Sequence, residues 1–180
     1  MRQMSIDVRT ISNGKPAKEF AVAVAAEELI KLTFSYTADI PRGMHSWLRN
    51  PMYNALIRLH QEIHLANETF VDYPAIKRTL ALLARWEQQK GAGDPEQLFF
   101  RQTIWHEQLR SFQRRLEHIT QAIVQLKTVC MYMRVLFEKR VVSTAQYEKW
   151  SATATDVQMM LGAWKASERK RVAPNQAAAR

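Results

Sequence analysis

The sequence predicts an all-α protein: an up-and-down four-helix bundle with an additional short inserted helix and a basic C-terminal tail. Only 5 Gly and 6 Pro stand among its 180 residues, too few turn residues for a protein of many strands. Apolar side chains recur at the three- and four-residue spacing of helices. We therefore expect a flexible N-terminal arm over residues 1–15, one helical bundle domain over 16–167, and a basic, disordered tail over 168–180.

The first two predicted helices are separated by a loop at residues 39–43. Pro16 suits the first turn of a helix, and the apolar spacing that follows predicts a helix to about Thr37. Asn50-Pro51 then supplies a cap residue and a proline at the first helical position. The expected apolar face of the second helix consists of Met52, Leu56, Leu59, Ile63, Ala66 and Phe70.

A shorter amphipathic helix is predicted for residues 74–89, and the loop Gly91-Ala92-Gly93-Asp94-Pro95 follows it. The strongest pattern comes next, because apolar residues then alternate at spacings of four and three and predict a long helix with one continuous seam. This seam consists of Trp105, Leu109, Phe112, Leu116, Ile119, Ile123, Leu126, Cys130, Met133 and Phe137. Further apolar residues around its middle, such as Val124 and Met131, predict cover on more than one side, by the bundle or by a neighbouring subunit.

The last helix is predicted from a capping box, Ser143-x-x-Gln146. Its seam consists of Tyr147, Trp150, Ala154, Val157, Leu161 and Trp164. The chain then ends in a basic cluster and an alanine-rich segment, which we expect to be a tail.

No pattern in the chain indicates catalysis, a cofactor or a metal site. The segment His60-Gln61-Glu62-Ile63-His64 departs from the His-Glu-x-x-His of zinc hydrolases, and we interpret it as two surface histidines. The Glu-x-x-His of two-metal bundles does not occur. Cys130 lies within the long seam, where a thiol behaves as a small hydrophobe. Gly91 and Gly93 lack the Lys-Ser or Lys-Thr of a phosphate-binding loop.

The charge of the chain is its main functional indication. A formal net charge of +9 and a pI of about 9.9 favour a polyanionic partner. Basic residues without an aromatic reading motif suggest phosphate contacts that carry no sequence preference. The candidate nucleic-acid-binding residues are Arg110, Arg114, Lys127, Arg134, Lys139, Arg140, Lys165, Arg169, Lys170 and Arg171. Cations at helix ends also complement the helix dipole, which is an alternative account of Lys139, Arg140 and the tail.

A cytoplasmic protein without membrane attachment is expected. A single cysteine excludes an internal disulfide and suits a reducing compartment. The N-terminal residues lack the apolar core of a secretory signal. No apolar run approaches the roughly 20 residues of a membrane-spanning helix.

Two groups of motifs resemble the Avd family, the accessory variability determinants of diversity-generating retroelements. The first comprises Ile40-Pro41-Arg42, Asn54-Ala55-Leu56 and Leu65-Ala66-Asn67. The second comprises Ser143-x-x-Gln146-Tyr147-Glu148 and Met160-Leu161-Gly162-Ala163-Trp164-Lys165-Ala166-Ser167, which is similar to the family's last helix. The resemblance implies a four-helix bundle that assembles as a basic, barrel-like pentamer. It also implies binding to the reverse transcriptase and to template RNA or its cDNA, in support of mutagenic copying.

The chain departs from that family at several points. Residues 71–111 are an insertion between the usual second and third helices, the N-terminal arm is additional, and Ala163 stands where the family often has glycine. A sister family, encoded by intervening sequences in bacterial ribosomal-RNA genes, shares the bundle. The alternative hypothesis is therefore a structural helical oligomer of that type, with no direct role in a retroelement.

Overall fold

The computed structural model describes residues 18–90, 99 and 106–172, and all regular structure in these residues is helical. The helices are α1 (Lys18–Tyr36), α2 (Asn50–Glu68), α3 (Tyr73–Lys90), α5 (His106–Glu138) and α6 (Thr144–Val172), with two short turns, η2 (Arg42–Met44) and η3 (His45–Arg49), before α2. The predicted arm at 1–15, the loop at 91–95 and residues 173–180 lie outside the described residues.

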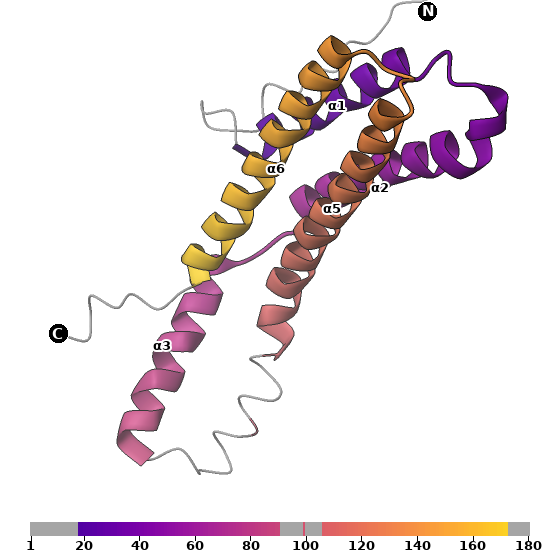
Figure 1. The fold of residues 1–180 in the computed structure, drawn as a ribbon. Coiled ribbons are helices and arrows are strands. Elements are labelled where there is room, and N and C mark those ends of the chain that lie inside the picture. Colours follow the sequence, from indigo (N-terminus) through magenta and orange to yellow (C-terminus); the bar gives the residue numbers. More distant parts are fainter. Residues whose placement is uncertain (1–17, 91–98, 100–105, 173–180) are drawn as a thin grey trace, which may run out of the picture.

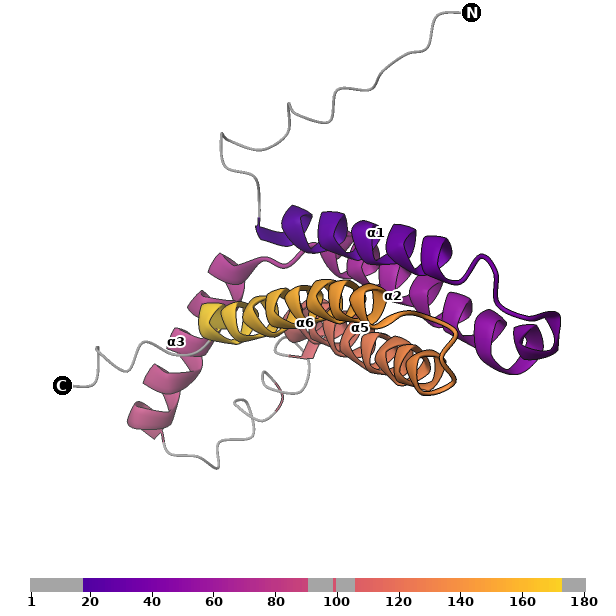
Figure 2. The ribbon, with the colours of Figure 1, turned by 45° about the horizontal axis from the view of Figure 1, so that its top comes forward.

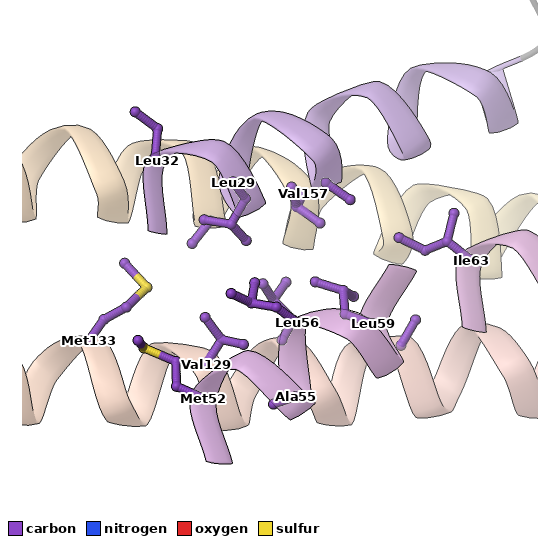
Figure 3. Close-up of a cluster of buried hydrophobic side chains, with 14 of the residues drawn as sticks. Leu29, Leu32, Met52, Ala55, Leu56, Leu59, Ile63, Val129, Met133 and Val157 are labelled. Carbon is purple, nitrogen blue, oxygen red and sulfur yellow. The ribbon is translucent and has the colours of Figure 1, made fainter. Parts of the chain in front are cut away.

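Four of the helices surround one core in a bundle-like arrangement (Figures 1 and 2). α1 packs against α2 and α6, and α5 packs against the other sides of α2 and α6. Apolar side chains from all four helices fill the space between them (Figure 3). The largest fully buried residues include Leu29, Leu56, Leu59, Ile63, Ile119, Leu126, Met133 and Trp150. The Trp150 indole Nε1 donates a hydrogen bond to Thr33 Oγ1 (2.9 Å), so α6 is joined to α1 inside the core.

The predicted capping box begins α6. The backbone N–H of Ser143 donates to Gln146 Oε1 (2.8 Å), and the backbone N–H of Gln146 lies 3.3 Å from Ser143 Oγ. These reciprocal bonds satisfy backbone N–H groups that a helix start leaves unpaired. The prediction of a helix start at this point is confirmed.

The C-terminus of α5 is closed by a Schellman motif. The backbone N–H of Val141 donates to the Leu136 carbonyl (3.0 Å), and that of Arg140 donates to the Phe137 carbonyl (2.9 Å). Arg140 adopts a φ of 57°, the left-handed conformation that this motif requires and that glycine adopts at least cost. The motif reverses the chain between α5 and α6 over only a few residues.

The buried stripe of α5 differs from the predicted seam at every second position. Phe112, Ile119, Leu126 and Met133 are buried as expected. The alternate positions are half-buried at 116, 123, 130 and 137, while the residues one position earlier, Arg115, Ala122, Val129 and Leu136, are buried. The two sets flank the same central line of the helix, so spacing alone does not distinguish them. The core therefore includes an arginine that the predicted seam omits.

Two further boundaries differ from the sequence prediction. Phe70 is 81% exposed, because α2 ends at Glu68 and the apolar face ends with it. The predicted border between the bundle and the tail, at residues 167 and 168, lies inside α6, which continues to Val172. Glu168 is fully buried there, so the first residues assigned to the tail belong to the packed helix.

α3 lies at one end of the molecule, where its start adjoins the end of α6 and the helix then runs away from the other four (Figure 1). Ile76, Thr79 and Leu83 form its buried side. Ile76 packs in a small second cluster with Val71 and Phe112, away from the main core. The inserted segment thus contains a helix, as the sequence predicts for residues 74–89, and this helix contacts α5 and α6. None of the described helices is long and apolar enough to cross a membrane.

Candidate nucleic-acid interface

The ten predicted phosphate-binding residues lie on the surface of α5, α6 and the turn between them. All of them are exposed except Lys165, which is half-buried. The structure does not bring them into one group. Arg110 and Arg114 lie near the start of α5, whereas Lys139 and Arg140 lie at its opposite end, with Lys127 and Arg134 between them.

The start of α5 and the end of α6 lie at the same end of the molecule, because the two helices are antiparallel (Figure 1). A contact between Arg115 of α5 and Glu168 of α6 joins them there. Arg110 and Arg114 therefore share this end with Lys165, Arg169 and Lys170. We call this the cationic end of the molecule.

Three basic residues of α3 were missing from the sequence prediction. Lys77, Arg78 and Arg85 are exposed, and α3 packs against both α5 and α6 at the cationic end. Residues 73–86 contain no Asp or Glu. This absence of acids was visible in the sequence, but the place of the inserted helix beside the end of α6 was not.

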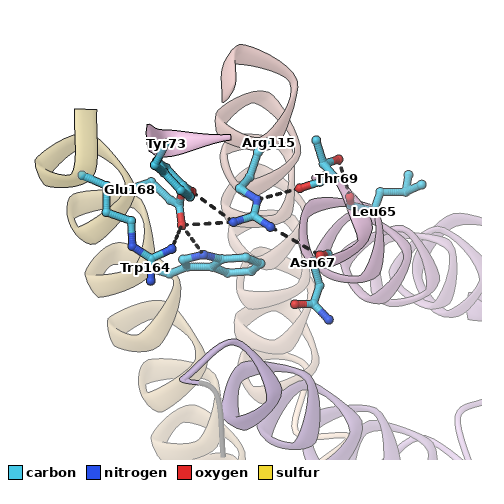
Figure 4. A network of polar contacts seen from close by, with 8 residues as sticks. Leu65, Asn67, Thr69, Tyr73, Arg115, Trp164 and Glu168 are labelled. Carbon is cyan, nitrogen blue, oxygen red and sulfur yellow. Dashed lines mark hydrogen bonds and ion pairs between the residues drawn. The ribbon is translucent and has the colours of Figure 1, made fainter. Parts of the chain in front are cut away.

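Beneath the cationic end lies a buried polar network centred on Arg115 and Glu168 (Figure 4). Arg115 is 8% exposed and Glu168 is fully buried. Their charged groups are 3.4 Å apart, from Nη1 to Oε1. The Trp164 indole Nε1 also donates to Glu168 Oε1 (3.2 Å), and the Tyr73 hydroxyl donates to Glu168 Oε2. The carboxylate of Glu168 is therefore contacted from α3, α5 and α6.

Arg115 also fixes the segment between α2 and α3. Its Nε donates to the Thr69 carbonyl (3.1 Å), its Nη2 to the Asn67 carbonyl (3.4 Å), and its Nη1 to the Tyr73 hydroxyl (3.1 Å). A guanidinium presents five N–H donors in a fixed fork, which suits several acceptors at once. One side chain of α5 thus holds the end of α2, the start of α3 and the end of α6 together.

The hydroxyl of Tyr73 has a raised pKa in this network. Burial raises the pKa of its hydroxyl above the usual value of 10.0, and the hydrogen bond to Glu168 adds to this shift. A hydrogen bond with Arg171 and the positive charge of Arg115 oppose the shift. Tyr73 therefore remains a neutral donor to Glu168 throughout the physiological pH range.

Two of the predicted phosphate-binding residues already have acidic partners. Arg171 Nη1 lies 3.1 Å from Glu168 Oε1, and its guanidinium stands 5.2 Å from the centroid of the Tyr73 ring. Arg134 Nε lies 2.9 Å from Glu138 Oε1. Arg171 is thus part of the buried network, while the Arg134 pair lies on an exposed face, where it contributes little to stability.

The sequence held a signal for Glu168, although the prediction stopped short of it. The seam of α6 continues at the same spacing from Trp164 to Glu168. An acid at a core position requires a partner, because a buried unpaired charge is very costly. Spacing alone does not identify Arg115, which lies beside the predicted seam, as the partner of Glu168. Only the structure shows this pair.

The histidines make contacts within and between helices. His60 and His64 lie one turn apart, with their Nε2 atoms 3.1 Å apart, and both are half-buried rather than fully on the surface. His118 Nδ1 of α5 lies 2.7 Å from Glu62 Oε2 of α2. No group of three or more metal-ligating side chains forms among the residues that the structure describes.

Cys130 packs against the core while remaining partly accessible. Burial raises the pKa of its thiol above the usual value of 9.0. A raised pKa lowers the fraction of thiolate, the reactive form. The side chain therefore lacks the activation that a cysteine nucleophile requires.

Comparisons with protein-family models, curated proteins and solved structures match nothing to this chain. The resemblance to the Avd family consequently depends on the sequence motifs alone. The surface of α3, α5 and α6 carries exposed cations, and a buried ion pair joins α5 to α6.

Proposed function

We propose that this chain is a non-catalytic accessory subunit of a diversity-generating retroelement. In this proposal it binds the reverse transcriptase and the template RNA or its cDNA through basic surfaces and supports mutagenic cDNA synthesis. The observation that carries the nucleic-acid part is the cationic end, where Arg110, Arg114, Arg169 and Lys170 are exposed. Such cations suit phosphates, which they bind without reading base sequence. The parts of the proposal that concern the retroelement and the reverse transcriptase depend on the resemblance of the sequence motifs to the Avd family.

The arrangement of the helices supports the same family assignment. We infer that α1, α2, α5 and α6 form an up-and-down four-helix bundle to which α3 is added. Each of these four helices packs against two of the others. Consecutive helices are in contact, with the insertion lying between α2 and α5, and the last helix, α6, packs against the first, α1. Antiparallel neighbours with short connections are typical of that bundle.

Assembly into a homo-oligomer, a pentamer by the resemblance, is part of the proposal. Val124 and Met131 lie seven residues apart on α5, on the same face of the helix, and both are about half exposed. Met159 of α6 is 60% exposed. Apolar side chains on outer helix faces support contacts with further subunits.

The same apolar residues support the second candidate, a structural oligomer of the type encoded by ribosomal-RNA intervening sequences. In that case the protein assembles but has no direct role in a retroelement, and its charge serves solubility. Binding to RNA distinguishes the two candidates, because phosphate contacts weaken steeply as salt rises.

Charge reversal at the start of α5 tests the proposal. Arg110→Glu with Arg114→Glu is expected to weaken RNA binding by about tenfold or more at low salt, since two phosphate contacts are replaced by repulsion. Fluorescence anisotropy with a labelled structured RNA measures this, and circular dichroism checks that helicity is kept. Arg42→Glu with Arg58→Glu is the matched control, since both arginines are exposed and lie before or within α2. Equal affinities for the two double variants would exclude the start of α5 from the interface.

A further inference from the structure

We propose that the inserted helix α3 is itself part of the nucleic-acid interface. In this proposal, Lys77, Arg78 and Arg85 bind the phosphate backbone together with the cations at the start of α5 and the end of α6. The inference rests on the proposed nucleic-acid binding and extends it to a segment that the sequence resemblance does not cover. Its ligand is the sugar-phosphate backbone of a nucleic acid.

The side of α3 that faces away from the bundle is cationic. Ile76, Thr79 and Leu83 are buried at a spacing of three and four, which defines the packed side of the helix. Arg78 and Arg85 are exposed and lie seven residues apart, so they share one face of the helix. The rise of a helix separates them by about 10 Å along its axis. Along the axis of a DNA duplex, where each strand carries one phosphate per about 3.4 Å, this distance spans about three phosphates of one strand.

The three basic residues of α3 in this proposal lack acidic partners within the part of the chain that the structure describes. No ion pair joins Lys77, Arg78 or Arg85 to an acid among the residues that the structure describes. The helix dipole favours cations only in the last turn, whereas Lys77 and Arg78 lie near the start of α3. Neither pairing nor the dipole therefore accounts for these two residues.

The buried network keeps the acid at the end of α6 away from the exposed cations Arg169 and Lys170 beside it. Glu168 is the only acid in the sequence between residues 165 and 172, and it is fully buried against Arg115. Its charge is thus turned inward, while Arg169 and Lys170 remain exposed. The end of α6 therefore presents cations to solvent, and no exposed acid lies beside them in the sequence.

The same network fixes α3 relative to this surface. Tyr73, the first residue of α3, bonds to both Glu168 and Arg115. Ile76 packs with Phe112 of α5 in the second apolar cluster. Cations held on fixed helices bind a backbone with less loss of conformational freedom than cations on a mobile arm. The contacts of Tyr73 and Ile76 thus hold the start of α3 in a fixed position relative to α5 and α6.

Two matched triple variants test the proposal. The first variant lacks these cations of α3 and carries Lys77→Gln, Arg78→Gln and Arg85→Gln. The control lacks exposed cations of α1, η2 and α2 and carries Lys31→Gln, Arg42→Gln and Arg58→Gln. Each set replaces one lysine and two arginines, so both lower the net charge equally. All six side chains are exposed, and surface substitutions of this kind change stability little. Circular dichroism and thermal unfolding check this for both proteins.

Affinity is measured by fluorescence anisotropy for a labelled RNA hairpin and for a single-stranded RNA of equal length, over a series of salt concentrations. The α3 variant is expected to bind about tenfold more weakly at low salt, with a salt dependence shallower by about two in the log–log slope. The control variant is expected to retain the slope of the wild type. A loss on the hairpin alone would assign the α3 contact to a duplex, and an equal loss on both RNAs would assign it to either strand form.

Two results would overturn the proposal, and they differ from each other. Equal affinities and slopes for the α3 variant, the control and the wild type would exclude α3 while leaving the proposed function intact. A wild-type protein that binds neither RNA at low salt would instead overturn the proposed nucleic-acid binding, and the role of α3 with it.

Discussion

At the scale of single residues, two charged side chains occupy positions that the helical repeat elsewhere gives to apolar residues. Arg115 lies in the buried stripe of α5, and Glu168 continues the buried stripe of α6. A buried ion pair gains little over an apolar pair of the same volume, but the loss of one partner is costly because the other charge is left unpaired. We therefore interpret the pair as fixing the positions of α5 and α6 relative to each other, rather than as a source of net stability.

Glu168→Gln tests this role. The substitution keeps the shape of the side chain but leaves the Arg115 guanidinium without its buried counter-charge, so we expect a loss of about 3 kcal/mol in the free energy of unfolding. Urea unfolding followed by circular dichroism measures the difference. Glu148→Gln on the same helix is the control, since Glu148 is exposed, and we expect a change within about 0.5 kcal/mol. Equal losses in the two variants would contradict the assignment.

At the scale of helices, patterns within one segment were predicted well and relations between segments were not. The capping box at Ser143 and the extent of the long helix follow from local chemistry, because a cap bonds to its own helix and an apolar period repeats along it. The choice between the stripe at Arg115 and the stripe at Leu116 depends on where α2 and α6 lie, which spacing does not encode. Phe70 illustrates the same limit, because its spacing continues the apolar face while the helix ends before it.

The candidate interface also has one part that could be predicted from the sequence and one part that depends on the fold. Basic residues are read directly from the sequence, so Arg110, Arg114, Arg169 and Lys170 were predicted. The contribution of α3 was not, because the insertion had no known place in the bundle. The role of Arg171 was also missed, since its partner Glu168 was assigned to a tail rather than to a packed helix. The proposed nucleic-acid interface depends on which helix ends meet, and this is a property of the whole fold.

The turn between α5 and α6 leads to a prediction about one helix end. Arg140 adopts a left-handed conformation at the position where the Schellman motif favours glycine. This conformation costs roughly 1 kcal/mol for a residue with a Cβ atom. Arg140→Gly is therefore expected to raise the free energy of unfolding by about 1 kcal/mol, which thermal and urea unfolding measure. A destabilised variant would show that the Arg140 side chain contributes more than its backbone conformation costs.

At the scale of the whole molecule, the charge is both large and unevenly placed. The formal net charge is +9, and the described part of the chain places exposed cations of three helices at one end. A local concentration of one sign of charge steers a polyanion toward that part of the surface and speeds association. The buried network beneath it keeps the helix ends in place, and in the proposed homo-oligomer the apolar residues on outer faces contact other subunits.

The salt dependence of RNA binding by the wild-type protein tests the central claim most directly. The exposed cations of the cationic end are Lys77, Arg78, Arg85, Arg110, Arg114, Arg169 and Lys170. If each neutralises one phosphate, the logarithm of the association constant falls with the logarithm of the salt concentration with a slope of about −5 for a single strand. Anisotropy titrations from low to physiological salt measure this slope. A steep negative slope is the predicted result, whereas no binding at low salt, or binding that does not change with salt, would contradict a phosphate-binding surface on this molecule.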